Sequence, residues 1–133
     1  MRVAIDTHDL TIHRPVELYK IMQAVLYREA YFDKHKEHAW AVALDHGRTI
    51  LNIEHLSTGT TNSTFIEPAE VLSVPLQKNA TSLMLVHTHP AGSLEPSEAD
   101  KDNTDRLIQA CKLMKVPLLD HLILTEASYY SFQ

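Results

Sequence analysis

Two segments of the chain, residues 16–31 and 100–114, place the residues expected to be buried three or four positions apart, as in an amphipathic helix. The first follows Pro15, which suits the first turn of a helix, and the second has aspartates near its start, where the helix dipole favours negative charge. A shorter helix is predicted over residues 69–78, where Pro75 should kink or shorten it because proline has no amide proton. The buried positions of the two long helices would be Val16, Tyr19, Met22, Val25, Leu26, Thr104, Leu107, Cys111 and Met114.

The remaining hydrophobic runs are short and favour β-strands. A turn at residues 45–48 would join the first two strands into a hairpin, and residues 57–63 are predicted to form a polar loop. The predicted strands are residues 37–45, 49–56, 82–86, 117–125 and 128–132. A hairpin, a strand between two helices and a final pair of strands favour an α/β fold with a mixed sheet flanked by helices, rather than a doubly wound parallel sheet.

The composition is that of an ordinary soluble globular protein, with 44% hydrophobic and 22% charged residues, and 133 residues are most simply one domain, residues 1–133. The chain shows no signal-peptide core and no apolar run of membrane-spanning length, so we expect a cytoplasmic protein without a membrane partner. Cys111 is the single cysteine, which excludes an intrachain disulfide and a cysteine-based zinc site. The net charge of -5, without a lysine or arginine cluster, argues against a nucleic-acid groove.

Candidate chemistry lies where the predicted strand 82–86 runs into two histidines. Because alternate residues of a strand share a face, His87 and His89 would point into the same space. A loop with proline and glycine follows, and Asp100 then falls in the first turn of the next helix. Two imidazoles and one carboxylate can hold zinc and leave a fourth position for water, which is the arrangement of catalytic zinc sites. The pattern therefore predicts a metal-dependent hydrolase.

A simpler interpretation of the same residues exists. Ser97 and Asp100 have the spacing of a helix-capping box, which needs no metal, and nine histidines in one chain make close pairs common. The combination of a buried strand, His-x-His, a returning loop and an acidic helix start favours the metal site. Capping and ligation are also compatible, because a fixed helix start fixes Asp100.

Metal-assisted hydrolysis would also need a general base. Glu37 is the best-placed candidate, at the mouth of a predicted strand in which small residues would leave space. These small residues are Ala39, Ala41 and Ala43.

The other histidines have simpler explanations. Neighbouring strand residues face opposite sides of a sheet, so only one of Asp120 and His121 can face the site, and His121 either is structural or orients a ligand. His38 should point away from Glu37, as a packing or surface residue. His35, His46 and His55 are expected in turns or at the surface, Trp40 in the core, and Cys111 as a small buried hydrophobe.

The histidine motif and its surroundings resemble a known family. His87-x-His89-Pro90, followed by Ser97-x-x-Asp100 with seven residues between His89 and Ser97, is the pattern of the JAMM (MPN-domain) metalloproteases. Further segments narrow the resemblance to the bacterial RadC-like JAB branch, over the chain from about residue 14 to its end. These segments are Gly59-Thr60-Thr61-Asn62-Ser63, Asn79-Ala80, Leu119-Asp120-His121-Leu122-Ile123 and Tyr129-Tyr130-Ser131-Phe132.

The resemblance implies an α/β fold similar to that of cytidine deaminases, with zinc held by His87, His89 and Asp100. Glu37 matches the family's upstream acid and would serve as general base, passing the proton of the attacking water to the leaving amine. Ser97 would donate a hydrogen bond to the oxyanion or to the attacking water. The implied reaction is hydrolysis of a peptide or isopeptide bond, on a peptide or protein substrate that the sequence does not identify.

The chain also departs from the family pattern. Thr88 and Ala91 stand where RadC-like proteins usually have asparagine and serine, and Ala69 stands where a Pro-Arg-Glu segment supplies an arginine. We expect a single JAMM domain without the helix-hairpin-helix module that often precedes it, which removes the clearest reason to expect DNA contact.

Two alternative functions stay open. The first is a metal-bound interaction module without turnover, since the departures spare every ligand but change residues near the substrate. The second is a DNA-associated protein or nuclease, which only the association of the family with DNA repair suggests. Zinc is preferred over iron or manganese because two imidazoles and a carboxylate suit it. A homodimer is the default oligomeric state.

Overall fold

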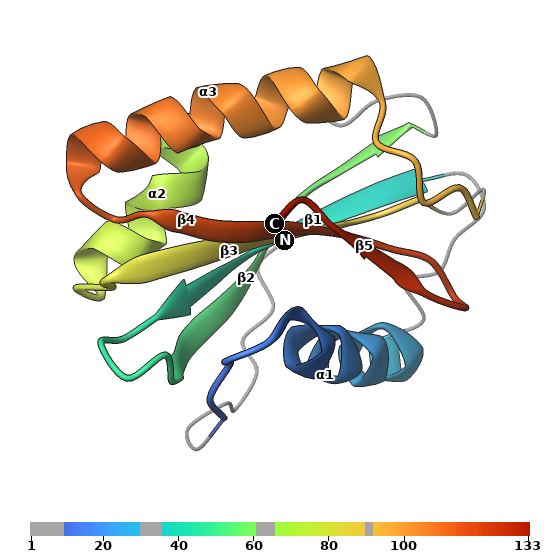
Figure 1. The fold of residues 1–133 in the computed structure, drawn as a ribbon, viewed down its shortest axis with the longest axis horizontal. Coiled ribbons are helices and arrows are strands. Elements are labelled where there is room, and N and C mark those ends of the chain that lie inside the picture. The colour runs from blue at the N-terminus through green and yellow to red at the C-terminus, as the bar shows by residue number, and fades with distance from the viewer. Residues whose placement is uncertain (1–9, 30–35, 61–65, 90–91) are drawn as a thin grey trace.

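The computed structural model of the chain describes residues 10–29, 36–60, 66–89 and 92–133. Over these residues, helices cover both faces of a five-stranded sheet (Figure 1). The elements in chain order are α1 (Pro15–Glu29), β1 (Lys36–Leu44), β2 (Ile50–Thr60), α2 (Pro68–Gln77), β3 (Ser82–Thr88), α3 (Glu98–Met114), β4 (Leu118–Leu124) and β5 (Tyr129–Ser131).

The strand order is β2-β1-β3-β4-β5, with β3 and β4 parallel and every other neighbouring pair antiparallel. A parallel pair needs a crossover connection, and here α3 makes it between β3 and β4. α2 and α3 lie on one face of the sheet and α1 on the other (Figure 1). The predicted fold, a mixed sheet flanked by helices, is confirmed.

The side-chain alternation of β1 divides the core into two clusters. Its large residues, among them the fully buried Trp40, pack in the cluster under α1, which confirms the core position predicted for Trp40. Its small residues Ala39 and Ala41 pack in the cluster under α2 and α3, together with Leu85, Leu107 and Cys111. The small side chains of β1 therefore lie on the same face as α3.

Strand β2 extends beyond its predicted end. Residues 57–60, predicted to begin a polar loop, continue the antiparallel pairing with β1, in which His38 lies opposite Thr58 and Lys36 opposite Thr60. This pairing satisfies the backbone of a segment whose composition is too polar to indicate a strand. The rest of the predicted loop, residues 61–63, lies outside the described residues, as do residues 30 and 31 at the predicted end of the first helix.

The helices follow their predictions closely, with differences at their ends. α3 begins two residues earlier than predicted, at Glu98, and Met114 at its end is 45% exposed, so its prediction as a buried residue was wrong. α2 ends two residues after Pro75, and the amide of Ala80 donates to the Pro75 carbonyl. Among the described residues, no helix has the length and hydrophobicity needed to cross a membrane.

The prediction that His55 is a turn or surface residue was wrong. His55 is 4% exposed on β2, and its Nε2 lies 3.1 Å from Nδ1 of His38, which is itself buried. Both rings lie beside Trp40 on the side of the sheet away from α3. His55 lies opposite Trp40 in the pairing of β2 with β1, and its contacts with the rings of Trp40 and His38 keep it from solvent. His46 is exposed in its turn as predicted, and His35 lies outside the described residues.

The stability of the core on the α3 face of the sheet should depend on the large side chains that are buried there beside the small ones. Replacing the fully buried Leu85 by alanine should lower the free energy of unfolding by about 2–5 kcal/mol, because the change removes buried methyl groups and leaves a cavity. Leu113→Ala is the matched control: this leucine is 82% exposed, and its loss should change stability by less than about 0.5 kcal/mol. Urea unfolding measures both, and equal effects would contradict this division of the core.

Candidate metal centre

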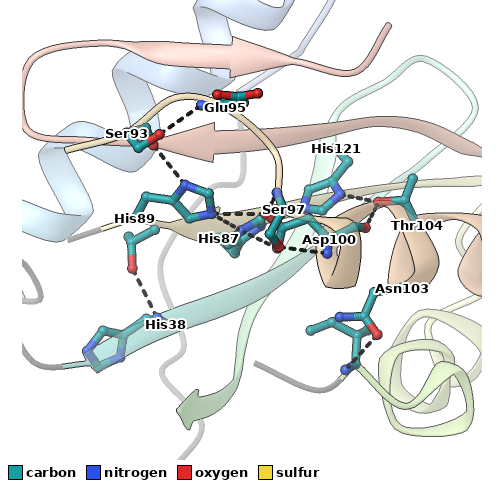
Figure 2. Close-up of polar contacts among 12 residues, drawn as sticks. His38, His87, His89, Ser93, Glu95, Ser97, Asp100, Asn103, Thr104 and His121 are labelled. Carbon is teal, nitrogen blue, oxygen red and sulfur yellow. Dashed lines mark hydrogen bonds and ion pairs between the residues drawn. The ribbon is translucent and has the colours of Figure 1, made fainter. Parts of the chain in front are cut away.

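The end of β3 and the start of α3 bring together the three residues expected to hold a metal. His87 is the sixth residue of β3, and His89 follows the strand, where its amide still donates to the carbonyl of Leu124. The extended backbone therefore continues through His89, and both imidazoles lie on the α3 side (Figure 2). Asp100 approaches them from the first turn of α3.

The ligand atoms of these residues converge closely. Nε2 of His87 lies 2.9 Å from Nε2 of His89, and 3.1 Å separates each of these nitrogens from one carboxylate oxygen of Asp100. The three residues form a group that could hold a metal ion, and each is at most 9% exposed. Tetrahedral zinc with bonds of about 2.1 Å needs ligand atoms about 3.4 Å apart, so small adjustments of these side chains would accommodate it.

The electrostatics of the cluster suit a cation. Burial raises the pKa of Asp100, but the imidazoles of His87 and His89 beside the carboxylate oppose this effect and hold its pKa well below the usual range, so the carboxylate is ionised. Burial lowers the pKa of His89, whereas its hydrogen bonds with Asp100 and with the Ser93 carbonyl, and the charges of Asp100 and Glu37, raise it above the usual value. The site therefore concentrates negative charge next to imidazole nitrogens.

The capping box predicted at the start of α3 is present and shares Asp100 with the cluster. Ser97 Oγ accepts a hydrogen bond from the Asp100 amide at 3.0 Å, and the Ser97 amide donates to Asp100 Oδ2 at 2.8 Å. Oδ1 of the same carboxylate points to His87. The helix start thus fixes the orientation of Asp100, so capping and metal binding are compatible at this residue.

Glu37 lies on the same side of β1 as the cluster. Ala39 pairs directly with His87, and Glu37 is two residues before Ala39, so side-chain alternation places it on the same face. Glu37 is 6% exposed, and its charge contributes to the raised pKa of His89. The structure thus brings the carboxylate of Glu37 within electrostatic reach of the cluster.

Thr88, one of the departures from the family pattern, has a structural contact. Its Oγ1 accepts a hydrogen bond from the backbone amide of His38 at 3.0 Å. This bond holds the start of β1, and with it the backbone next to Glu37, against the end of β3. Ala91, the other departure in this loop, lies outside the described residues.

Two further buried residues belong to the site: His121, for which the sequence left a structural and a ligand-orienting role open, and Thr104, which the sequence did not assign to it. His121 Nε2 lies 2.6 Å from His87 Nδ1, and Thr104 Oγ1 lies 2.6 Å from His121 Nδ1. Of the two alternatives for His121, contact with a candidate ligand is the one observed, and Asp120 faces away. Thr104 was expected only on the buried side of its helix. Its position one turn after Asp100 is the sequence feature that could have assigned it to the site.

Desolvation has opposite consequences for two other titratable groups on this face. His121 is 2% exposed, and its burial lowers the pKa well below the usual value, so the ring is neutral. Burial also raises the pKa of the Cys111 thiol to about 11. Cys111 is therefore a buried, protonated side chain of the core, as predicted, and not a nucleophile.

Comparison with known proteins agrees with this geometry. Residues 12–133 match the family described as the RadC-like JAB domain. A UPF0758 protein of Chlorobium phaeovibrioides is 38% identical over 101 residues, which are 76% of this chain and 45% of the relative. A UPF0758 protein of Pelodictyon phaeoclathratiforme is 39% identical over 101 residues, 76% of this chain and 46% of the relative. The chain thus spans less than half the length of these curated relatives, whose names state no activity. The motif, the fold and the match over residues 12–133 together show that the chain belongs to the RadC-like JAB domain family.

Proposed function

We propose that this domain is a zinc-dependent hydrolase that cleaves peptide or isopeptide bonds. The observation that carries the proposal is the convergence of two imidazole nitrogens and one ionised carboxylate, from His87, His89 and Asp100, within a buried cluster. A protein seldom buries such groups together without a cation to balance them. Two imidazoles and one carboxylate suit zinc and leave a fourth position for water or substrate.

The residues around the cluster supply the remaining chemistry. Zinc, when bound, would act as a Lewis acid and lower the pKa of a bound water towards about 7. Glu37 would accept a proton from the attacking water and deliver it to the leaving amine, for which its place on the face of His87 is suitable. Ser97 Oγ already accepts from the Asp100 amide, so its own hydroxyl proton can be donated to the developing oxyanion.

Two functions from other classes compete with this proposal. A metal-bound interaction module would keep the same cluster but have no turnover, and the substitutions at Ala69 and Ala91 relative to the usual pattern leave it open. A DNA-associated protein or nuclease is disfavoured by the net charge of -5. The substrate, a cytoplasmic location and a homodimer stay predictions.

Metal content tests the cluster directly. Wild-type protein purified without chelators or a metal-binding tag should contain about one zinc per chain. His89→Ala should lose most of this zinc, because it removes one of three ligands, whereas His46→Ala should keep it, because His46 is an exposed turn residue. Elemental analysis measures the three proteins. A wild type that contains no zinc and takes none up would contradict the proposal.

Glu37→Gln separates metal binding from catalysis. The variant should keep its zinc and lose about 10²–10⁴-fold in turnover, because the amide cannot accept the proton of the attacking water. The readout is cleavage of a mixed library of peptides and isopeptide-linked peptides, followed by mass spectrometry.

Glu98→Gln is the matched control for that experiment, since the side chain of Glu98 is 87% exposed and should not affect cleavage. Zinc loss in Glu37→Gln would contradict the role assigned to Glu37. A zinc-bound wild type that cleaves no member of the library would instead favour the interaction module.

A further inference from the structure

A chain of short polar contacts runs from His87 away from the metal cluster. His87 Nδ1 lies 2.6 Å from His121 Nε2, and His121 Nδ1 lies 2.6 Å from Thr104 Oγ1. Thr104 Oγ1 then donates to the backbone carbonyl of Asp100 at 2.7 Å. His121 comes from β4 and Thr104 from α3, and both are at most 5% exposed (Figure 2).

The direction of each hydrogen bond follows from the last one. A backbone carbonyl can only accept, so the single hydroxyl proton of Thr104 is committed to Asp100. Thr104 Oγ1 must therefore accept the hydrogen bond from His121, which places a proton on His121 Nδ1. An uncharged imidazole has a single N–H, so with that proton on Nδ1, facing Thr104, His121 presents a lone pair at Nε2.

The hydrogen bond between His121 and His87 places the next proton. The lone pair on His121 Nε2 faces His87 Nδ1 at 2.6 Å, so His87 Nδ1 must carry a proton and donate it. A neutral His87 then has its lone pair on Nε2, the nitrogen that faces His89 and Asp100. We propose that Thr104 and His121 are positioning residues that fix this tautomer of His87 and direct its Nε2 lone pair into the cluster.

This inference deepens the proposed metal site and rests on it for its consequence. The two histidines of the cluster reach the same tautomer in different ways. His89 Nδ1 donates directly to the Ser93 carbonyl at 2.8 Å, an acceptor with only one role. His87 faces another imidazole, which can donate or accept, so a second residue must define the role of that imidazole. Thr104 supplies this definition.

The surroundings of His121 restrict the plane of its ring and hold its backbone. Phe132 stacks on the ring, with centroids 4.4 Å apart and planes 4° apart, and its amide donates to the His121 carbonyl. The amide of His121 donates to Asp120 Oδ1 at 2.7 Å. The Thr104 hydroxyl also connects two candidate ligands. It contacts His121, which contacts His87, and it donates to the backbone carbonyl of Asp100.

Loss of the Thr104 hydroxyl should therefore allow His121 and His87 to adopt the other tautomer. Without an acceptor at Nδ1, His121 would favour a proton on Nε2 and donate it to His87 Nδ1. A neutral His87 would then carry its proton on Nε2, in the position that a metal ion needs. Residues that orient metal ligands in this way typically account for about 10–100-fold in metal affinity.

The test compares Thr104→Val, which removes the hydroxyl at nearly constant volume, with Thr104→Ser, which keeps it. The first readout is the protonation of the ring nitrogens in the metal-free chain, from long-range ¹H–¹⁵N NMR at about pH 8.5, where an ordinary imidazole is neutral. Wild type and Thr104→Ser should show His87 and His121 protonated on Nδ1, whereas Thr104→Val should show the proton of His121 on Nε2.

The second readout is zinc affinity, from competition with a chelating dye. Thr104→Val should bind zinc about 10–100-fold more weakly than wild type, and Thr104→Ser should restore affinity. Urea unfolding of both variants identifies any loss caused by reduced stability. His87 protonated on Nε2 in the wild type, or Thr104→Val with unchanged tautomers and unchanged zinc affinity, would overturn the inference. If the wild type shows the expected tautomers but binds no zinc, the result would support the positioning role of Thr104 and His121 and refute the metal site.

Discussion

The carboxylate of Asp100 connects the folding of the chain to the geometry of its candidate site. Oδ2 accepts the backbone amide of Ser97 and so stabilises the start of α3, while Oδ1 lies 3.1 Å from His87. Burial alone would raise the pKa of this group, but its hydrogen bonds hold the pKa below the usual range, so the buried group stays charged. The helix cannot form its cap without also presenting a carboxylate to the two histidines, so the fold preorganises the site.

The other requirement of the site is a sheet with a different surface on each side. In β1, Trp40 fills the core under α1, whereas Ala39 and Ala41 leave the opposite face shallow. Ala39 lies directly opposite His87 in the sheet, so a small residue stands beside a candidate ligand, and Glu37, two residues before Ala39, lies on the same face. One strand thus stabilises the larger core cluster and brings a carboxylate to the cluster of histidines.

Local patterns were sufficient for much of this structure. Helical spacing located α3, and the spacing of His87, His89 and Asp100 predicted residues that do converge. Features that depend on distant partners could not be predicted. Residues 57–60 are strand only because β1 pairs with them, and His55 is buried because the same strand places Trp40 opposite it. The contact of His121 with His87 needs the parallel register of β3 and β4, and its contact with Thr104 needs α3 packed over both, which no single segment of sequence specifies.

The most direct test of the account is a crystal structure of the zinc-loaded domain with anomalous scattering measured at the zinc edge. We predict one strong peak bonded to Nε2 of His87, Nε2 of His89 and an oxygen of Asp100, at about 2.0–2.2 Å, with a fourth position open to solvent. His121 should stay outside the coordination sphere, with its Nε2 still accepting a hydrogen bond from His87 Nδ1. A peak elsewhere in the molecule, or one coordinated by His121 in place of His87, would contradict the account.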